Sequence, residues 1–315
     1  MSDETATPKR ILCLPLLNEI WALELRLPYE YPFYDRFVIV EGTKTFAGRD
    51  KRLYFPRYRD RFEQYMDKIE YWIVDDLPQV LDEQYVGTRE RWAPENRWPL
   101  ERHTRNAFRG VLRSLGLAGD DIVFVADIDE ILDIEKMSRL FAEPAEDNDY
   151  YVFSLLDYRG SIYAQAREAR EFRGGYAIKH KHIGNDLFFL RAATCRGQSL
   201  SIPGFSRCLF PSERDLEMSS FVDVNLEMRV VPQAGWHFSH MSGGLQEWLK
   251  FKVQNFSHSE SSVGETPVAT ERDWVDALEE FIAGREYQFD GVDPDVPGFV
   301  TGRLPSFKIL LNPKK

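Results

Sequence analysis

Residues 122–130 read Ile-Val-Phe-Val-Ala-Asp-Ile-Asp-Glu. The five apolar residues predict a strand buried on both faces, as the central strand of a parallel sheet must be. Earlier apolar runs also predict strands, namely Ile11–Leu17, Arg36–Val40 and Tyr71–Val74. Helical periodicity separates them, first at Ile20, Leu23 and Leu27 and later between Leu100 and Leu115. This alternation predicts an α/β fold with a mostly parallel sheet flanked by helices.

The second half of the chain has a different pattern. From Tyr150 onward it is β-rich and aromatic, and Leu187–Leu190 also predicts a strand. After Gly264 an amphipathic helix near Trp274–Ile282 precedes a segment rich in glycine and proline. The predicted layout is a flexible N-terminus over 1–10, one catalytic domain over 11–263, and a C-terminal extension over 264–315. That extension is expected to pack on the catalytic domain as a subdomain.

Acidic residues follow the predicted strands at the point where each strand ends. Three of them, Glu19, Glu41 and Asp127, are candidates for a site. Ligands of open parallel sheets bind outside the carboxyl ends of the strands, so this coincidence indicates a site. Asn18, beside Glu19, is expected to line the same cleft.

The pattern Asp-x-Asp occurs three times, which shows how little it means alone. Asp147/Asp149 and Asp293/Asp295 lie in polar or Pro/Gly-rich segments and predict solvated loops. Only Asp127/Asp129 directly follows a buried strand, where two carboxylates can converge on one hard divalent cation. The alternative is that these acids cap a helix beginning near Ile131. Glu130 could support the metal site or be the cap itself.

Composition excludes some classes of protein. The 315-residue chain carries a formal net charge of -11, which disfavours a nucleic-acid partner because phosphate backbones require a positive surface. Its 3 cysteines have no metal-ligand spacing and suit a reducing compartment. Neither a signal peptide nor a transmembrane segment is predicted. A cytoplasmic protein is therefore expected, although it could still work at a membrane surface.

Several segments together resemble glycosyltransferase family 17, the β-1,4-mannosyl-glycoprotein β-1,4-N-acetylglucosaminyltransferase family. The segments that carry the resemblance are Asn18-Glu19 with Glu24 and Arg26, Phe37–Glu41 with Thr45-Phe46, Lys51 with Leu53–Phe55, Asp127–Ile131, Gly235–Ser239, Lys250 with Lys252 and Phe256–His258, and Leu304-Pro305 with Asn312. The resemblance implies a GT-A-type, Rossmann-like fold, UDP-N-acetylglucosamine as donor, Mn²⁺ or a similar ion, and inversion at the anomeric carbon. Because no membrane anchor is predicted, we expect a polysaccharide or glycolipid acceptor rather than an N-glycan.

The resemblance also suggests roles for particular residues. Asp129 is expected to bind the metal, and Asp127 the metal, the ribose or both. His237, which could equally be a core histidine, and His258 are the further metal candidates. Candidate contacts to the donor are Asn18, Glu19, Glu41, Arg102, Arg105, Asn106, Lys250 and Lys252. Alternatives remain for two of these groups: Glu41 could be a solvated turn acid, and the arginines a solvated helix face.

The catalytic base is the least determined role. Asp157, Asp186 and Glu247 are candidates, and spacing does not select among them; Glu247 is favoured, with Asp157 second. Two other functions stay open: a non-catalytic module that binds nucleotide sugars or carbohydrate, and a metal-dependent sugar nucleotidyltransferase. The second is disfavoured because no Gly-rich phosphate loop with a following Lys lies near the first predicted strand.

Overall fold

The computed structural model describes residues 7–46, 48–77, 98–159, 164–166, 172–183, 187, 190–191, 226–239, 241, 251, 287–289 and 298–301. Glu247, Lys250, Lys252 and His258 lie outside these ranges, as does the predicted helix Trp274–Ile282. The predicted domain boundaries therefore stay predictions. No described helix is long and apolar enough to cross a membrane.

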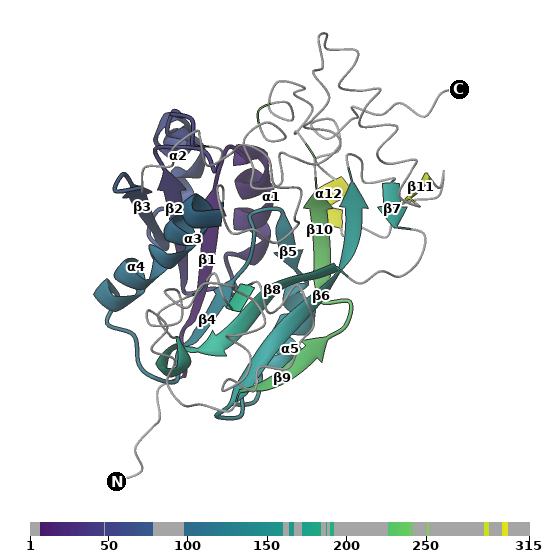
Figure 1. Ribbon diagram of the computed structural model, residues 1–315. Helices are drawn as coiled ribbons and strands as arrows, with labels where there is room; N and C mark the ends of the chain where they lie inside the picture. The colour runs from purple at the N-terminus through teal and green to yellow at the C-terminus, as the bar shows by residue number, and fades with distance from the viewer. Residues whose placement is uncertain are drawn as a thin grey trace.

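A parallel sheet forms the first half of the fold (Figure 1). Its strands are β1 (Arg10–Leu16), β2 (Arg36–Gly42), β3 (Ile69–Val74) and β4 (Ile122–Val125), in the order β4-β1-β2-β3. All four predicted strands are confirmed. Each apolar run is bounded by polar residues, which made the strand recognisable in the sequence.

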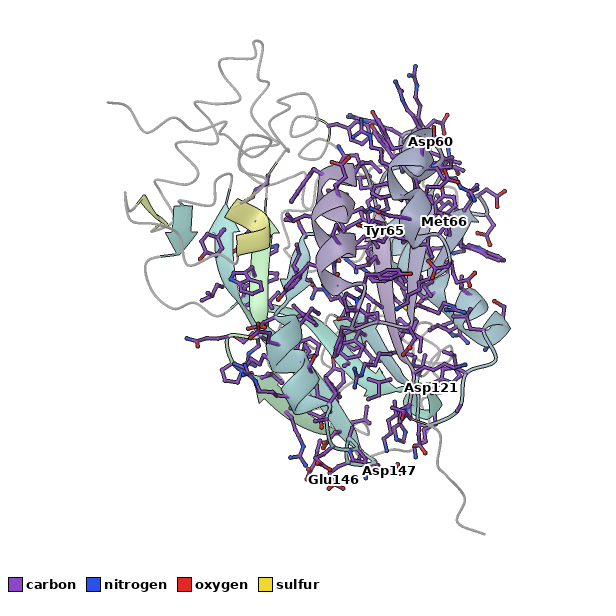
Figure 2. The ribbon with its side chains drawn as sticks, turned by 180° about the vertical axis from the view of Figure 1, so that it is seen from behind. Asp60, Tyr65, Met66, Asp121, Glu146 and Asp147 are labelled. Carbon is purple, nitrogen blue, oxygen red and sulfur yellow. The ribbon has the colours of Figure 1, made fainter. Side chains whose placement is uncertain are left out.

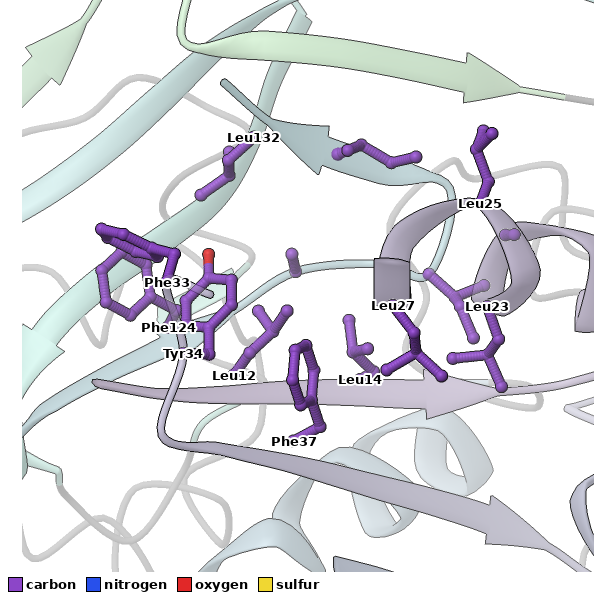
Figure 3. Close-up of a cluster of buried hydrophobic side chains, with 14 of the residues drawn as sticks. Leu12, Leu14, Leu23, Leu25, Leu27, Phe33, Tyr34, Phe37, Phe124 and Leu132 are labelled. Atoms are coloured by element: carbon purple, nitrogen blue, oxygen red, sulfur yellow. The ribbon is translucent and has the colours of Figure 1, made fainter. Parts of the chain in front are cut away.

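Helices cover both faces of this sheet. They are α1 (Ile20–Glu30), α2 (Tyr54–Tyr58), the 3-10 helix η1 (Arg59–Tyr65), α3 (Trp98–Asn106), α4 (Phe108–Ser114) and α5 (Ile134–Leu140). Alternate residues of β1 belong to two separate cores. Leu12 and Leu14 pack with α1, while Cys13 packs with α4. Figure 3 shows the first core, in which side chains of α1 lie over β1 and β2.

Beyond β4 the sheet is mixed. It continues through β8 (Phe172–Lys179), β6 (Asp149–Arg159), β7 (Ala164–Ala166) and β11 (Tyr287–Phe289), and each of these strands is antiparallel to its neighbour on the path. β9 (Glu227–Val231) and β10 (Gly235–Ser239) pair parallel with β6. β10 also pairs antiparallel with β5 (Glu130–Leu132). The fold is thus mixed α/β, with its parallel half preceding the acidic turn and its mixed half following it.

Two local predictions were wrong. The helix expected near Ile131 does not start there, because residues 130–132 form β5 against a strand late in the chain. Helix α5 begins at Ile134 instead, and Asp133 caps it by accepting hydrogen bonds from the backbone N–H groups of Glu135 and Lys136. The described residues of Leu187–Leu190 are helical rather than extended. In the first case a distant strand decided the conformation, and in the second a short apolar run did not distinguish a strand from a buried helix.

The other Asp-x-Asp pairs lie away from the acidic turn or outside the described residues. Asp147 is 63% exposed and pairs with Lys181, as expected for a solvated loop. Asp149 is instead buried at the start of β6 and accepts a hydrogen bond from Tyr151 at 2.6 Å, so its predicted exposure was wrong. Figure 2 shows Asp147 and Asp121 at the same end of the molecule. Because Asp121 precedes β4, this end lies opposite the acidic turn that follows the strand. Asp293/Asp295 is not described.

Gly235 permits the close contact between β10 and β5. A Cβ atom on Gly235 would lie 2.1 Å from the carbonyl oxygen of Ile131 and 2.7 Å from Cα of Leu132. Backbone atoms cannot move aside as a flexible side chain can. We therefore expect Gly235→Ala to lower the free energy of unfolding by roughly 3 kcal/mol, the upper part of the range for overpacking, as measured by urea denaturation.

Gly110 provides the matched control, because it lies inside α4 and a Cβ atom there meets nothing within 4 Å. Gly110→Ala should raise stability by about 0.5–1 kcal/mol through helix propensity. Equal effects of the two substitutions would contradict the close packing of β10 on β5.

Candidate functional site

The turn from Asp127 to Asp129 connects β4 with β5, at the carboxyl ends of the parallel strands. Because β4, β1 and β2 are neighbours, this end of the sheet also carries Glu19 and Glu41. The turn is closed by two internal hydrogen bonds. The backbone N–H of Glu130 donates to the carbonyl of Asp127 at 3.0 Å, and the N–H of Asp127 donates to Oε2 of Glu130 at 2.9 Å. Glu130 therefore supports the turn and does not cap a helix; its predicted support of a metal site stays a prediction.

Two buried arginines hold the carboxylate of Asp127. Nη2 of Arg105, from α3, donates to Oδ1 at 2.6 Å, and Nη2 of Arg191 donates to Oδ2 at 2.9 Å. Arg191 also pairs with Glu130, and Nε of Arg105 donates to Glu101 at 2.8 Å. The side chain of Asp127 is still 29% exposed. The site thus combines a partly accessible carboxylate with two buried positive charges.

Nη1 of Arg105 is buried and has no hydrogen-bond partner among the described residues. A buried guanidinium N–H without an acceptor is costly, so such groups usually mark a place where a ligand or water binds. Arg105 is buried rather than on a solvated helix face, which excludes that alternative for this residue.

A second cluster joins Asp129 to the late strand β10. Nε2 of His237 lies 3.9 Å from Oδ1 of Asp129, and its Nδ1 lies 2.8 Å from Oδ1 of Asp157. The imidazole ring stacks on Phe172, with ring centroids 3.9 Å apart. Pairing of β10 with both β5 and β6 produces this arrangement, because it sets His237 opposite Glu130 on one side and Asp157 on the other.

The charges in the two clusters shift several pKa values. Burial alone would raise the pKa of Asp127, but the guanidinium groups of Arg105 and Arg191 hold it well below its usual range. Burial raises the pKa of Glu130, and Arg191 only partly opposes this. Burial favours neutral His237, but the hydrogen bond to Asp157 and the charge of Asp129 outweigh it and raise its pKa. Asp127 is therefore a fixed anion at neutral pH.

The donor set of Asp129 and His237 fits a divalent cation. Metal–oxygen and metal–nitrogen bonds are each about 2.1 Å long, so ligand atoms 3.9 Å apart can contact one ion between them. A carboxylate on the far nitrogen, as Asp157 provides, is the usual support of a metal-binding histidine. Within the described residues no group of three or more His, Cys, Asp or Glu forms a metal cluster. Asp127 would have to share its oxygens with two arginines.

Glu41 has a different environment from the one expected. Its carboxylate is fully buried and accepts from Nζ of Lys51 at 2.5 Å and from the hydroxyl of Tyr71 at 2.9 Å. The backbone N–H groups of Tyr54 and Phe55 donate to it at 2.6 and 3.0 Å. Four donors saturate a carboxylate. Glu41 therefore ties β2 to β3 and α2; the solvated-acid alternative is wrong, and a nucleotide contact would require it to release a partner.

The remaining predicted donor residues are partly accounted for. Asn18 and Glu19 are buried at the end of β1, where Glu19 accepts from the backbone N–H of Asn18 at 3.0 Å. Oδ1 of Asn106 accepts from the backbone N–H of Leu187 at 2.9 Å, so Asn106 holds the segment that carries Arg191. Arg102 lies on α3, three residues before Arg105.

Sequence reasoning missed two residues of the site. Arg191 follows an apolar run that predicts a strand, so nothing local connects it with Asp127. Arg26 donates from Nη1 to the backbone carbonyls of Asp127 and Ile128, at 2.8 and 3.1 Å. The signal for Arg26 was its place among the residues that carry the family resemblance; in the structure it is buried in α1 together with Leu25 and Leu27.

A family match supports the assignment to the glycosyltransferases. Residues 3–143, somewhat less than half of the chain, match the model of the family described as Glycosyltransferase family 17. Over these residues the match confirms the resemblance seen in the sequence. It includes the acidic turn, α1 and α3, whereas Arg191 and His237 lie beyond it.

Other comparisons add little. No curated protein matches the chain. One similar solved structure, a 4-diphosphocytidyl-2C-methyl-D-erythritol synthase, is 15% identical, covers 60% of this chain and 85% of its own, and gives a TM-score of 0.33. The corresponding Anaerococcus prevotii synthase is 11% identical, covers 72% and 87%, and scores 0.34. The inositol-1-phosphate CTP transferase from T. maritima is 11% identical, covers 80% and 98%, and scores 0.30. Scores this low do not establish a common fold.

Proposed function

We propose that this protein is an inverting, metal-assisted glycosyltransferase of GT-A type that moves N-acetylglucosamine or a related sugar from a UDP-sugar to a carbohydrate hydroxyl. The observation that carries the proposal is the pairing of Asp129 with a carboxylate-supported His237, beside an aspartate held by two buried arginines. Together these groups offer ligands for a cation and positive charge for a diphosphate, as a nucleotide-sugar donor requires.

The described residues suggest a division of roles. Asp129 and His237 would hold Mn²⁺ or Mg²⁺, which when bound would neutralise charge on the departing diphosphate. Arg105 would donate from its unpartnered Nη1 to a phosphate oxygen. Asp127, fixed as an anion and partly exposed, suits hydrogen bonds from ribose hydroxyls. Asn18 and Glu19 would contribute to the same pocket from the end of β1.

The base that takes the acceptor proton is proposed separately. Asp157 is buried against His237, a position that suits support of a ligand better than proton transfer to an acceptor. Glu247 therefore stays the first candidate, and Lys250, Lys252 and His258 remain candidates for donor and metal contacts. A polysaccharide or glycolipid acceptor, bound at a membrane surface in the second case, completes the proposal.

A panel of nucleotide sugars tests this function. Purified protein with Mn²⁺ and a set of glycan and glycolipid acceptors is expected to release UDP fastest from UDP-N-acetylglucosamine. Faster release from another donor would overturn the donor sugar but not the class. Binding of UDP without any release would instead support a non-catalytic binding module. Pyrophosphate released from UTP and a sugar phosphate would support a nucleotidyltransferase.

Asp157→Asn should separate support of a metal ligand from base catalysis. If Asp157 orients His237, its loss of charge should raise the Mn²⁺ concentration for half-maximal rate by roughly 10–100-fold. Saturating Mn²⁺ should then restore most of the rate. If Asp157 is the base, the rate should stay low at every Mn²⁺ concentration, which contradicts our assignment. Initial rates across a Mn²⁺ titration make the measurement.

A further inference from the structure

Arg26 and Glu30 form an ion pair inside α1 that is fully shielded from solvent, with both side chains 0% exposed. Nε of Arg26 donates to Oε2 of Glu30 at 2.7 Å, and Nη2 donates to Oε1 at 3.1 Å. Removing two charges from water is costly, and replacing such a pair by apolar residues of similar size is often neutral or stabilising. Stability alone therefore does not explain why the pair is there.

The pair reaches the acidic turn through its remaining donor. Nη1 of Arg26 donates to the carbonyl of Asp127 at 2.8 Å and to that of Ile128 at 3.1 Å. These carbonyls lie between the end of β4 at Val125 and the start of β5 at Glu130, so strand pairing does not hold them. Two carbonyl dipoles converging on one guanidinium fix the backbone from which both aspartates project.

We infer that the buried Arg26–Glu30 pair positions the acidic turn, so that Asp127 and Asp129 keep their places opposite Arg191 and His237. Glu30 fixes the plane of the guanidinium, and the guanidinium fixes the turn. The inference rests on the proposed function for its catalytic consequence. Arg26 is accordingly a positioning residue, acting through the backbone of the turn.

Arginine is the side chain that fits this task. The planar guanidinium presents N–H donors on several edges, so one edge can donate to a carboxylate while another donates to two carbonyls. A lysine has one ammonium at the end of a flexible stem and cannot span both groups. Because both members of the pair come from α1, which packs on β1 and β2, the helix sets the turn relative to the parallel sheet.

The double variant Arg26→Met/Glu30→Met tests the inference in the full-length protein. It removes both charges together, whereas either single change to Met would leave a buried charge uncompensated. We expect amide hydrogen exchange in residues 126–132 to become at least about tenfold faster, with little change in melting temperature. We also expect kcat to fall about 100-fold, because small displacements of reacting groups cost that much. The Mn²⁺ concentration for half-maximal rate should rise about tenfold.

Arg61→Met is the matched control. It breaks the ion pair between Arg61 and Glu24, which also involves α1 but is largely exposed, with 51% and 35% of the two side chains accessible. In this variant, amide hydrogen exchange in residues 126–132 should stay at the wild-type rate. The kcat for sugar transfer should also be unchanged. Unchanged exchange in the double variant would overturn the inference, whatever the activity. If the wild type transfers no sugar but exchange rises as expected, the proposed function fails and the positioning role stands.

A second variant covers the case in which the double variant does not fold. Arg26→Lys keeps a cation beside Glu30 but cannot also hold both carbonyls. We expect it to fold, to exchange faster in residues 126–132, and to lose about tenfold in kcat at unchanged donor KM, in keeping with a displaced turn. Wild-type exchange and kcat in Arg26→Lys would overturn the inference.

Discussion

Asp129→Asn is expected to lower sugar transfer by roughly 1,000-fold, the loss typical of removing a group that stabilises charge in the transition state. Asparagine keeps the shape of the side chain but loses the negative charge that a divalent cation requires. The backbone carbonyl of Asp129, which accepts from the N–H of Phe238 at 2.8 Å, is unaffected, so the fold should survive. UDP release at saturating donor, with circular dichroism as a check on folding, makes the measurement.

The second Asp-x-Asp pair supplies the control for this prediction. Asp147→Asn removes a carboxylate that is 63% exposed and lies at the opposite end of the sheet. Its transfer rate should equal that of the wild type. A rate for Asp129→Asn within a few-fold of the Asp147→Asn rate would show that Asp129 does not carry the metal.

Asp127→Ala is expected to cost about 3 kcal/mol of stability, because breaking a buried ion pair by removing one partner leaves the other charge uncompensated. The cost should lie at the lower end of the range for buried pairs, because in the variant Arg105 would still pair with Glu101 and Arg191 with Glu130. The depressed pKa of Asp127 has the same origin, namely attraction to the two guanidinium groups. Urea denaturation at neutral pH measures the effect.

Asp133→Ala calibrates that experiment. Asp133 caps α5 by accepting two backbone hydrogen bonds. Its loss should lower the free energy of unfolding by about 1 kcal/mol, which is typical of a helix N-cap. A loss for Asp127→Ala no larger than this would mean that the arginines do not depend on Asp127. The larger loss would show that the acidic turn is built around buried charge.

The parallel half of the fold could be predicted because its information is local. Each of β1 to β4 overlaps a predicted apolar run, and α1 and α4 carry buried apolar residues that pack in the two cores. β5 could not be predicted, because three residues after an acidic turn become a strand only when β10 pairs with them. The helical conformation of Leu187 and Leu190 was missed because an apolar run does not by itself distinguish a strand from a buried helix.

In the candidate site, too, residues marked by a local pattern could be predicted and residues brought in from distant segments could not. Asp127 and Asp129 were found because they directly follow a buried strand, and His237 was proposed from a resemblance rather than from spacing. The arginines that fix Asp127 come from α3 and from the segment held by Asn106, and no periodicity connects them. Glu41 was correctly placed at a strand end, yet its saturation by four donors depends on β3 and α2.

We propose that the acidic turn and His237 form one metal site. Electron spin echo spectroscopy of Mn²⁺ bound in the presence of UDP can test this, because an imidazole nitrogen on the ion gives a distinct modulation. We predict this modulation in the wild type and its loss in His237→Gln. Tightly bound Mn²⁺ without the modulation in the wild type, or an undiminished modulation in His237→Gln, would contradict the claim.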